Sequence, residues 1–288
     1  MKYNIKEENK IKLTILIDNN TIIDRYFLAE PGLSFYIEED DKKILFDVGY
    51  SNAFLINAQK MRINLLDSDY VVISHGHLDH TWGLPHLINL ITEAVIEKQP
   101  CKKAELVAHP DAFSLKIIPE IGPIGSIVSV NMLNHYFSLK LSQKPRWLTP
   151  NVVFLGEIPR KYDFEAKNPI GKTMKEGEEI EDYLIDDTAI AVRSSRGLIV
   201  ITGCSHAGIC NIVEYARQIC QEDKVYDIIG GFHLLDPSQE QIENTVKYLE
   251  NLNPDRIHAC HCVDLPSKIA LSRVANLVEV GSGIVIEY

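Results

Sequence analysis

The sequence predicts a mixed α/β protein whose functional residues stand at the ends of strands. Apolar, β-branched runs such as residues 70–73 alternate with segments whose apolar residues recur at helical spacing. Histidines follow several of the predicted strands, at residues 75–80 and at His206, His233 and His261. Ligands sit at strand ends in layered α/β folds, so these histidines are candidate site residues. We expect one domain over residues 1–288 with two β-rich halves, each ending in α/β units.

The first half contains mainly strands bounded by turn-forming residues. The predicted elements are, in order, a strand at 11–17, a hairpin of 33–37 and 43–46 about 38–41, a helix from about 51–52, a strand at 70–73, a helix with an apolar face at 84–91, a strand at 104–108, and a loop with an edge strand at 122–130.

The second half repeats this alternation and ends in α/β units. The predicted elements are a strand at 152–155, a hairpin of 188–192 and 198–201, a helix at 209–220, a strand at 225–229, a helix from 236, and a final strand pair around 256–262, 277–280 and 284–287. Asp236 as N-cap, Pro237 at the first helical position and Gln239 at the third predict the start of that last helix.

Residues 162–187 lose the apolar period and become charged and glycine-containing. An irregular stretch of this length in a compact domain is usually a lid, an insertion or a disordered loop. We therefore expect either a lid over the site or a passive insertion.

Composition restricts the class of protein. With 45% hydrophobic and 24% charged residues the chain resembles soluble enzymes, and a net charge of −11 argues against nucleic acid as a partner. No run of about eighteen apolar residues occurs and the N-terminus lacks a signal-peptide core, so we expect a cytoplasmic protein without a membrane partner. The six cysteines lack the spacing of a disulfide scaffold, and the sequence leaves open a homo-oligomer.

The densest functional signal is the segment 74–80, which carries His75, His77, Asp79 and His80. Alternate side chains of an extended segment point the same way, so the first three can face one side while a turn brings His80 beside them. Imidazole nitrogen and carboxylate oxygen are the donors that Zn²⁺ and related ions take. A solvated histidine-rich loop is the weaker interpretation, because a buried histidine needs a hydrogen-bond partner.

Together with further motifs, this loop resembles the metallo-β-lactamase superfamily. The motifs also resemble one branch of it, the dihydropterin-methyl ribofuranosylaminobenzene-phosphate synthase-like proteins. They are Asp47-x-Gly49 and the segments 74–80, 156–160, 186–187, 202–209, 230–234 and 261–262. The resemblance implies an αββα four-layer sandwich with one or two metal ions at the edge between its sheets.

The resemblance also implies roles for individual residues. It assigns His75, His77 and His206 to one metal, and Asp79, His80 and His261 to the other. It further implies that Asp47 holds a ligand histidine by a hydrogen bond, although an Asp there could instead cap the next helix.

One position in this ligand set stays open. Many relatives carry Gly-Asp where this chain has Gly203-Cys204, and that Asp bridges the two metals. Either Cys204 takes the position, or His206 substitutes, or the second metal is bound weakly. A zinc ribbon around Cys260 and Cys262 is disfavoured, because no partner Cys-x-x-Cys exists.

These residues suggest hydrolysis of an anionic, phosphate-containing small molecule by a metal-bound hydroxide. A metal held by imidazoles lowers the pKa of bound water from about 15.7 to about 7. Asp79 can move the proton, while His233 either binds substrate phosphate, transfers a proton or makes a structural hydrogen bond. The start of the helix after His206 suits a phosphate or carboxylate.

The cofactor and two other functions complete the expectations. The first two candidate ligands of the segment 74–80, His75 and His77, are both histidines, which favours one or two Zn²⁺ ions, with Mn²⁺, Fe²⁺ or Ni²⁺ as alternatives. The branch resemblance implies a transferase that joins a dihydropterin-methyl diphosphate to a ribofuranosylaminobenzene phosphate. The last alternative is a metal-dependent ligand-binding module without turnover.

Overall fold

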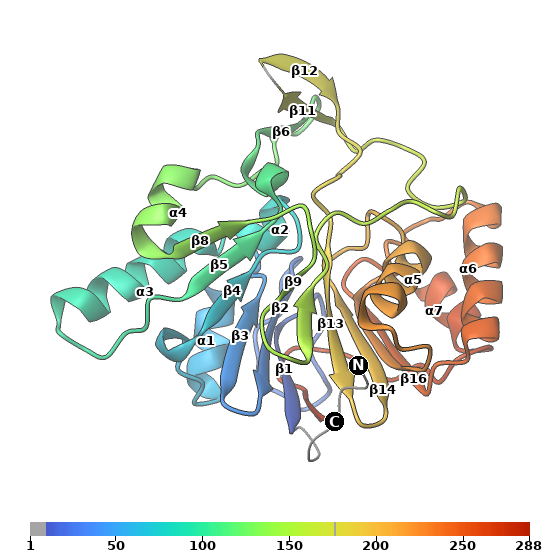
Figure 1. Cartoon of the computed structure of the whole chain (residues 1–288), viewed down its shortest axis with the longest axis horizontal. Helices are drawn as coiled ribbons and strands as arrows, with labels where there is room; N and C mark the ends of the chain where they lie inside the picture. The colour runs from blue at the N-terminus through green and yellow to red at the C-terminus, as the bar shows by residue number, and fades with distance from the viewer. Residues whose placement is uncertain (1–9, 176) are drawn as a thin grey trace.

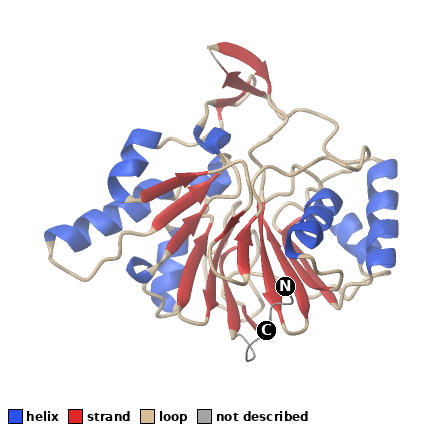
Figure 2. Cartoon of the chain, viewed as in Figure 1, coloured by secondary structure: helices blue, strands red, loops and turns tan. Residues whose placement is uncertain are grey.

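A computed structural model of the chain describes residues 10–175 and 177–288. Two main β-sheets lie face to face, and helices cover the outer face of each (Figures 1 and 2). The predicted αββα four-layer arrangement is confirmed.

The first sheet has seven strands in the order β17-β1-β2-β3-β4-β5-β8. The strands are β1 (Ile11–Ile17), β2 (Ser34–Glu39), β3 (Lys42–Phe46), β4 (Tyr70–Val72), β5 (Glu105–Ala108), β8 (Ser138–Leu141) and β17 (Val285–Glu287). Strands β3, β4, β5 and β8 are parallel to their neighbours in this series, so their carboxyl ends reach the same edge.

The second sheet has six strands in the order β16-β15-β14-β13-β10-β9. The strands are β9 (Arg146–Trp147), β10 (Val152–Phe154), β13 (Ala189–Ser194), β14 (Gly197–Thr202), β15 (Val225–Gly231) and β16 (Arg256–Cys260). Strands β14, β15 and β16 are parallel, so the loops that follow them carry His206, His233 and His261 to one edge.

A small third sheet projects at the top of Figure 1, in the order β12-β11-β6-β7. Its strands are β6 (Lys116–Ile118), β7 (Gly122–Pro123), β11 (Lys172–Lys175) and β12 (Glu178–Glu181). The prediction of an irregular stretch over 162–187 is therefore wrong for the pair β11 and β12, because β11 also pairs with β6, which is distant in sequence. Whether the segment moves as a lid stays a prediction.

Seven α-helices and two short 3₁₀ helices occur in the described part of the chain. They are α1 (Ala53–Lys60), η1 (Leu65–Asp67), α2 (Leu78–Thr81), α3 (Leu84–Ile96), η2 (Pro110–Phe113), α4 (Val130–Tyr136), α5 (Ile209–Cys220), α6 (Gln239–Leu252) and α7 (Leu265–Leu271). Within the described residues, none of these helices has the length and apolar content to span a bilayer.

Three apolar layers hold the sandwich together. Side chains such as Phe35 and Phe154 fill the space between the two main sheets. Phe54 and Leu84 belong to the layer between the first sheet and its helices, and Leu249 to the layer on the second sheet. Burial of this apolar surface fixes the two sheets and so brings their strand ends together.

Two sequence predictions near the C-terminal half are wrong. Helix α6 begins at Gln239 with Ser238 as its N-cap, because the Ser238 hydroxyl accepts from Gln241 N, whereas Asp236 has a left-handed φ of 46°. Residues 277–280 form only an isolated bridge between Ile257 and Leu277, and β17 pairs with β1 in the other sheet.

Candidate metal centre

The histidine loop leaves β4 and runs into a short helix. His77 is extended and forms the N-cap of α2, while Asp79 and His80 lie in its first turn. The expectation that His75, His77 and Asp79 share one face of an extended segment is wrong, because the helix starts between them. The loop therefore supplies donors to two groups.

The first group consists of three buried imidazoles, those of His75, His77 and His206. One ring nitrogen from each lies within 4.8 Å of the others, and the Nε2 atoms of His75 and His206 are 3.2 Å apart. The structure thus brings together the three residues that the resemblance assigns to one metal.

Hydrogen bonding fixes the tautomer of His75. The Ser74 hydroxyl donates to Asp47 Oδ2 at 2.6 Å, so it can only accept from His75 Nδ1, 3.0 Å away. The Nε2 atom of His75 then carries a lone pair and faces His206. His77 Nε2 is buried and has no hydrogen-bond partner among the described residues.

The second group consists of Asp79, His80, Cys204 and His261. His80 Nε2 lies 3.2 Å from Cys204 Sγ and 3.3 Å from His261 Nε2, and Asp79 Oδ2 lies 3.2 Å from His261 Nε2. Of the alternatives left open by the sequence, the geometry puts Cys204 in this group and His206 in the other.

The donors of the second group fit a metal ion. His80 Nδ1 donates to Asp47 Oδ2 at 2.6 Å, and His261 Nδ1 donates to Asn19 Oδ1 at 2.8 Å. In the neutral imidazoles both Nε2 atoms therefore carry lone pairs, so these rings can bind a metal ion through Nε2 once His80 gives up its proton. A tetrahedral zinc site with bonds of about 2.0–2.1 Å has ligand nitrogens about 3.3 Å apart, which matches the spacing here.

Asp47 fixes His80, one of the candidate ligands, by a hydrogen bond. Its carboxylate also accepts from Ser74 N at 2.7 Å, and the N-cap of α1 is Asn52 rather than Asp47. The predicted hydrogen bond between Asp47 and a histidine of the loop is confirmed, and the role of His80 as a ligand stays a prediction. A carboxylate behind an imidazole sets the tautomer and orientation of a metal ligand.

Asp18 and Asn19 support His261 in the same way, and sequence reasoning missed them. Asp18 Oδ1 accepts from His261 N at 2.9 Å, and Asn19 holds the ring nitrogen. Their only signal in the sequence is a polar triplet after the strand β1, and 242 residues separate Asn19 from the histidine that it contacts.

Charges around the second group favour a cation there. Burial alone would lower the pKa of His80, but Asp79 and Asp47 raise it to about 9. Burial would raise the pKa of Asp79, but His80 and His261 hold it well below its ordinary value. In the first group, burial lowers the pKa of His75 and His206, which keeps these imidazoles neutral and available as ligands.

His233 lies beside the first group rather than in either group. Its ring centroid is 4.3 Å from that of His206, and its backbone N donates to Cys262 Sγ at 3.3 Å. Its Nδ1 is buried and has no partner within the described part of the chain. A role in phosphate binding or proton transfer stays a prediction.

The expected anion site at the start of α5 is already filled by the chain itself. The buried carboxylate of Glu165 accepts from Cys210 N at 3.0 Å and from Asn211 N at 3.1 Å. The prediction that these donors take a substrate phosphate is wrong for this structure, because an internal carboxylate satisfies them.

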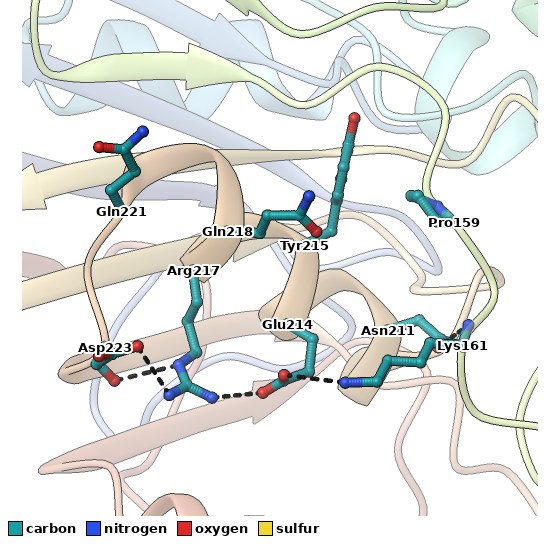
Figure 3. A pocket seen from close by; sticks show the side chains of 9 residues that line it. All are labelled: Pro159, Lys161, Asn211, Glu214, Tyr215, Arg217, Gln218, Gln221 and Asp223. Carbon is teal, nitrogen blue, oxygen red and sulfur yellow. Dashed lines mark hydrogen bonds and ion pairs between the residues drawn. The ribbon is translucent and has the colours of Figure 1, made fainter.

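Two cavities of the structure are lined by different kinds of residue. The larger, about 530 Å³, lies along α5, where Arg217 and Lys161 pair with Glu214 (Figure 3). The smaller, about 270 Å³, has His206 and His233 in its wall. Only the smaller of the two adjoins the predicted metal ligands.

Comparisons with known proteins agree with this fold. A profile of the metallo-β-lactamase superfamily matches residues 28–107. The 7,8-dihydropterin-6-methyl-4-(beta-D-ribofuranosyl)-aminobenzene-5'-phosphate synthase of Methanocaldococcus jannaschii is 32% identical over 275 residues, which cover 91% of this chain and 90% of that protein. The crystal structure of Tm1679, a metal-dependent hydrolase of the β-lactamase superfamily, has a TM-score of 0.80 and 28% identity, covering 96% of this chain and 99% of that one.

The chain therefore belongs to the metallo-β-lactamase superfamily. Within the superfamily it is similar to the archaeal synthase over nine tenths of its length.

Proposed function

We propose that the chain hydrolyses an anionic, phosphate-containing small molecule at a dinuclear zinc centre. The observation that carries this proposal is the pair of donor groups, in each of which imidazole nitrogens face one another; His206 of the first group also lines the 270 Å³ cavity. Bound metal ions supply Lewis acidity that polarises a phosphoryl oxygen and makes water a stronger acid.

Two side chains would provide the proton transfers, Asp79 of the second donor group and His233 in the wall of the cavity. Asp79 is ionised and its side chain is 23% exposed, so it can accept the proton of the attacking water. As water bonds to phosphorus and the bond to the leaving oxygen breaks, His233 delivers a proton to that oxygen. Its position in the cavity wall and its unpaired ring nitrogen, among the described residues, support this assignment.

The donor set supports zinc over manganese. Burial raises the pKa of the Cys204 thiol, so Cys204 would lose its proton as it binds a metal ion. The resulting thiolate is a soft ligand, and sulfur with imidazole favours zinc, whereas Mn²⁺ prefers oxygen ligands. The six cysteines of the described chain are all free, which supports a reducing, cytoplasmic location.

The test is a panel of phosphodiester, lactone and thioester substrates with the zinc-loaded full chain. We expect phosphodiester cleavage, and loss of at least about 100-fold in kcat for Asp79→Asn, as removal of a proton-transfer group does. Failure of the fully loaded protein to act on any member of the panel would refute hydrolysis.

The relation to the M. jannaschii synthase supports a second candidate function. In this alternative the chain joins a dihydropterin-methyl diphosphate to a ribofuranosylaminobenzene phosphate, and the diphosphate leaves. Incubation with both substrates and mass analysis of the joined product distinguishes the transferase from the hydrolase. Ligand protection against melting without any product would instead identify a binding module.

A further inference from the structure

Lys116, on β6 of the small sheet, is a buried lysine between two carboxylates. Its side chain is 1% exposed, and its Nζ lies 2.9 Å from Asp182 Oδ2 and 2.8 Å from Asp186 Oδ1. A buried ammonium is stable only when it is paired and hydrogen-bonded, so this lysine is fixed in place. The group lies outside the two donor groups of the metal centre.

Asp186 connects this ion pair to the histidine loop. Its second oxygen, Oδ2, accepts from Gly76 N at 2.8 Å, and Gly76 stands between His75 and His77. A Cβ at Gly76 would lie 2.2 Å from Ala112 O and 2.8 Å from Lys116 Cε. The backbone between the two ligand histidines is therefore pressed against the lysine side chain and hydrogen-bonded to its partner.

The rest of the loop is braced by neighbouring backbone. His77 forms an isolated bridge with Gly125, and Thr188 N donates to Ser74 O at 2.9 Å. The side-chain link through Asp186 is thus the contact that ties the loop to a charged pair. Its loss would free the backbone at Gly76 while the bridges on either side remain.

We propose that Lys116 and Asp186 form a clamp that positions His75 and His77 and so sets the metal affinity of the three-imidazole group. Both are positioning residues, because they act through the backbone of the loop. The inference rests on the metal-binding half of the proposed function and is independent of which reaction follows.

Charge and position make opposite predictions for Lys116. Burial lowers the pKa of His75 and His206 most, and the neighbouring imidazoles come next. The ammonium of Lys116 lowers these pKa values further. By charge alone, its removal would make the group more attractive to a cation. The clamp requires the reverse, so the sign of the change separates the two explanations.

The experiment compares Lys116→Met with Lys172→Met in the full chain, titrated with Co²⁺ and then with Zn²⁺ in competition. Lys172 lies on β11 of the same small sheet and pairs with Glu179 at the surface, so it is a matched control. The thiolate-to-cobalt charge-transfer band reports the group containing Cys204, and the part of the visible d–d absorption that does not follow this band during the titration reports the imidazole group.

We expect Lys116→Met to weaken the imidazole group about 10- to 100-fold, as loss of supporting contacts does, while the Cys204 group and the control change by less than about threefold. Unchanged or tighter binding by a folded Lys116→Met would overturn the clamp. A wild-type chain that binds no metal would overturn the proposed function as well.

Hydrogen exchange at the Gly76 amide gives a readout free of metal. In the metal-free protein we expect this amide to be protected in the wild type and to exchange at least about tenfold faster in Lys116→Met. If that variant fails to fold, Asp186→Ala is compared with Asp186→Asn, which keeps an acceptor for Gly76 N. Equal Gly76 exchange in these two variants and the wild type would reject the clamp.

Discussion

Glu165 allows a quantitative prediction about pH and stability. Its carboxylate is buried at the start of α5, and within the described chain no lysine or arginine pairs with it. Burial raises its pKa, the backbone N–H groups of Cys210 and Asn211 oppose the rise, and the result is a pKa of about 7. We predict that Glu165→Gln removes a pH-dependent loss of stability.

The sign and size follow from proton linkage. The folded carboxyl has a pKa of about 7 against 4.5 for its ordinary value, so between these limits the folded state binds more protons. Stability is fully present below pH 4.5 and falls as the pH rises toward 7. The fall between pH 5 and pH 8 is about 2.5 kcal/mol.

Urea unfolding of the chelator-treated protein at several pH values measures this quantity. Gln does not titrate, so the stability of Glu165→Gln relative to the wild type should rise by about 2.5 kcal/mol from pH 5 to pH 8. Any constant cost of placing an amide against two N–H donors cancels in this comparison. Glu250→Gln, on the exposed side of α6, should show no such trend. A flat difference for Glu165→Gln over this range would refute the assignment.

Three further predictions concern the metal centre. Asn19→Ala removes the acceptor of His261 Nδ1 and should weaken the second group for zinc by about 10- to 100-fold in calorimetry, and unchanged affinity would contradict the support role. Cys204→Ser should abolish the thiolate-to-cobalt band, whereas Cys101→Ser, away from the site, should keep it. When the free zinc concentration is 100 times the Kd, removal of the zinc by a chelator should lower the free energy of unfolding by about 2.7 kcal/mol per site. Identical melting with and without chelator would argue against metal binding.

Elements with strong local periodicity could be predicted from the sequence. The strand β1 and the helix α5 have the predicted bounds, because their apolar residues alone decide which face is buried. The hairpin of β11 and β12 was missed, since it has few apolar residues and depends on pairing with β6. Asp236 and Ser238 are both strong capping residue types, so the sequence alone does not show that Ser238 forms the cap.

The residues of the candidate site also fall into those that could be predicted from the sequence and those that could not. The density of donors in residues 74–80 identified the loop, and the resemblance supplied the distant histidines. Among the supports, the resemblance supplied Asp47 and included residues 186–187 in a motif, but Lys116 had no such signal, because it is separated from Asp182 and Asp186 by 66 and 70 residues. A buried lysine has no local pattern that distinguishes it from a surface lysine. Its partners become visible only when the fold brings them together.

The backbone at the site shows why the fold, and not local preference, determines the geometry. Asp47, Ser205, His233 and His261 all have left-handed φ, at 56°, 64°, 50° and 56°, and each lies within three residues of the end of a strand. Such a conformation costs about 1–3 kcal/mol for a residue with a side chain. At His261 the cost is offset by Asp18, which accepts from the backbone N. A glycine would adopt these turns more easily but would remove the side chain, so the sandwich core must supply the stability that these four residues cost.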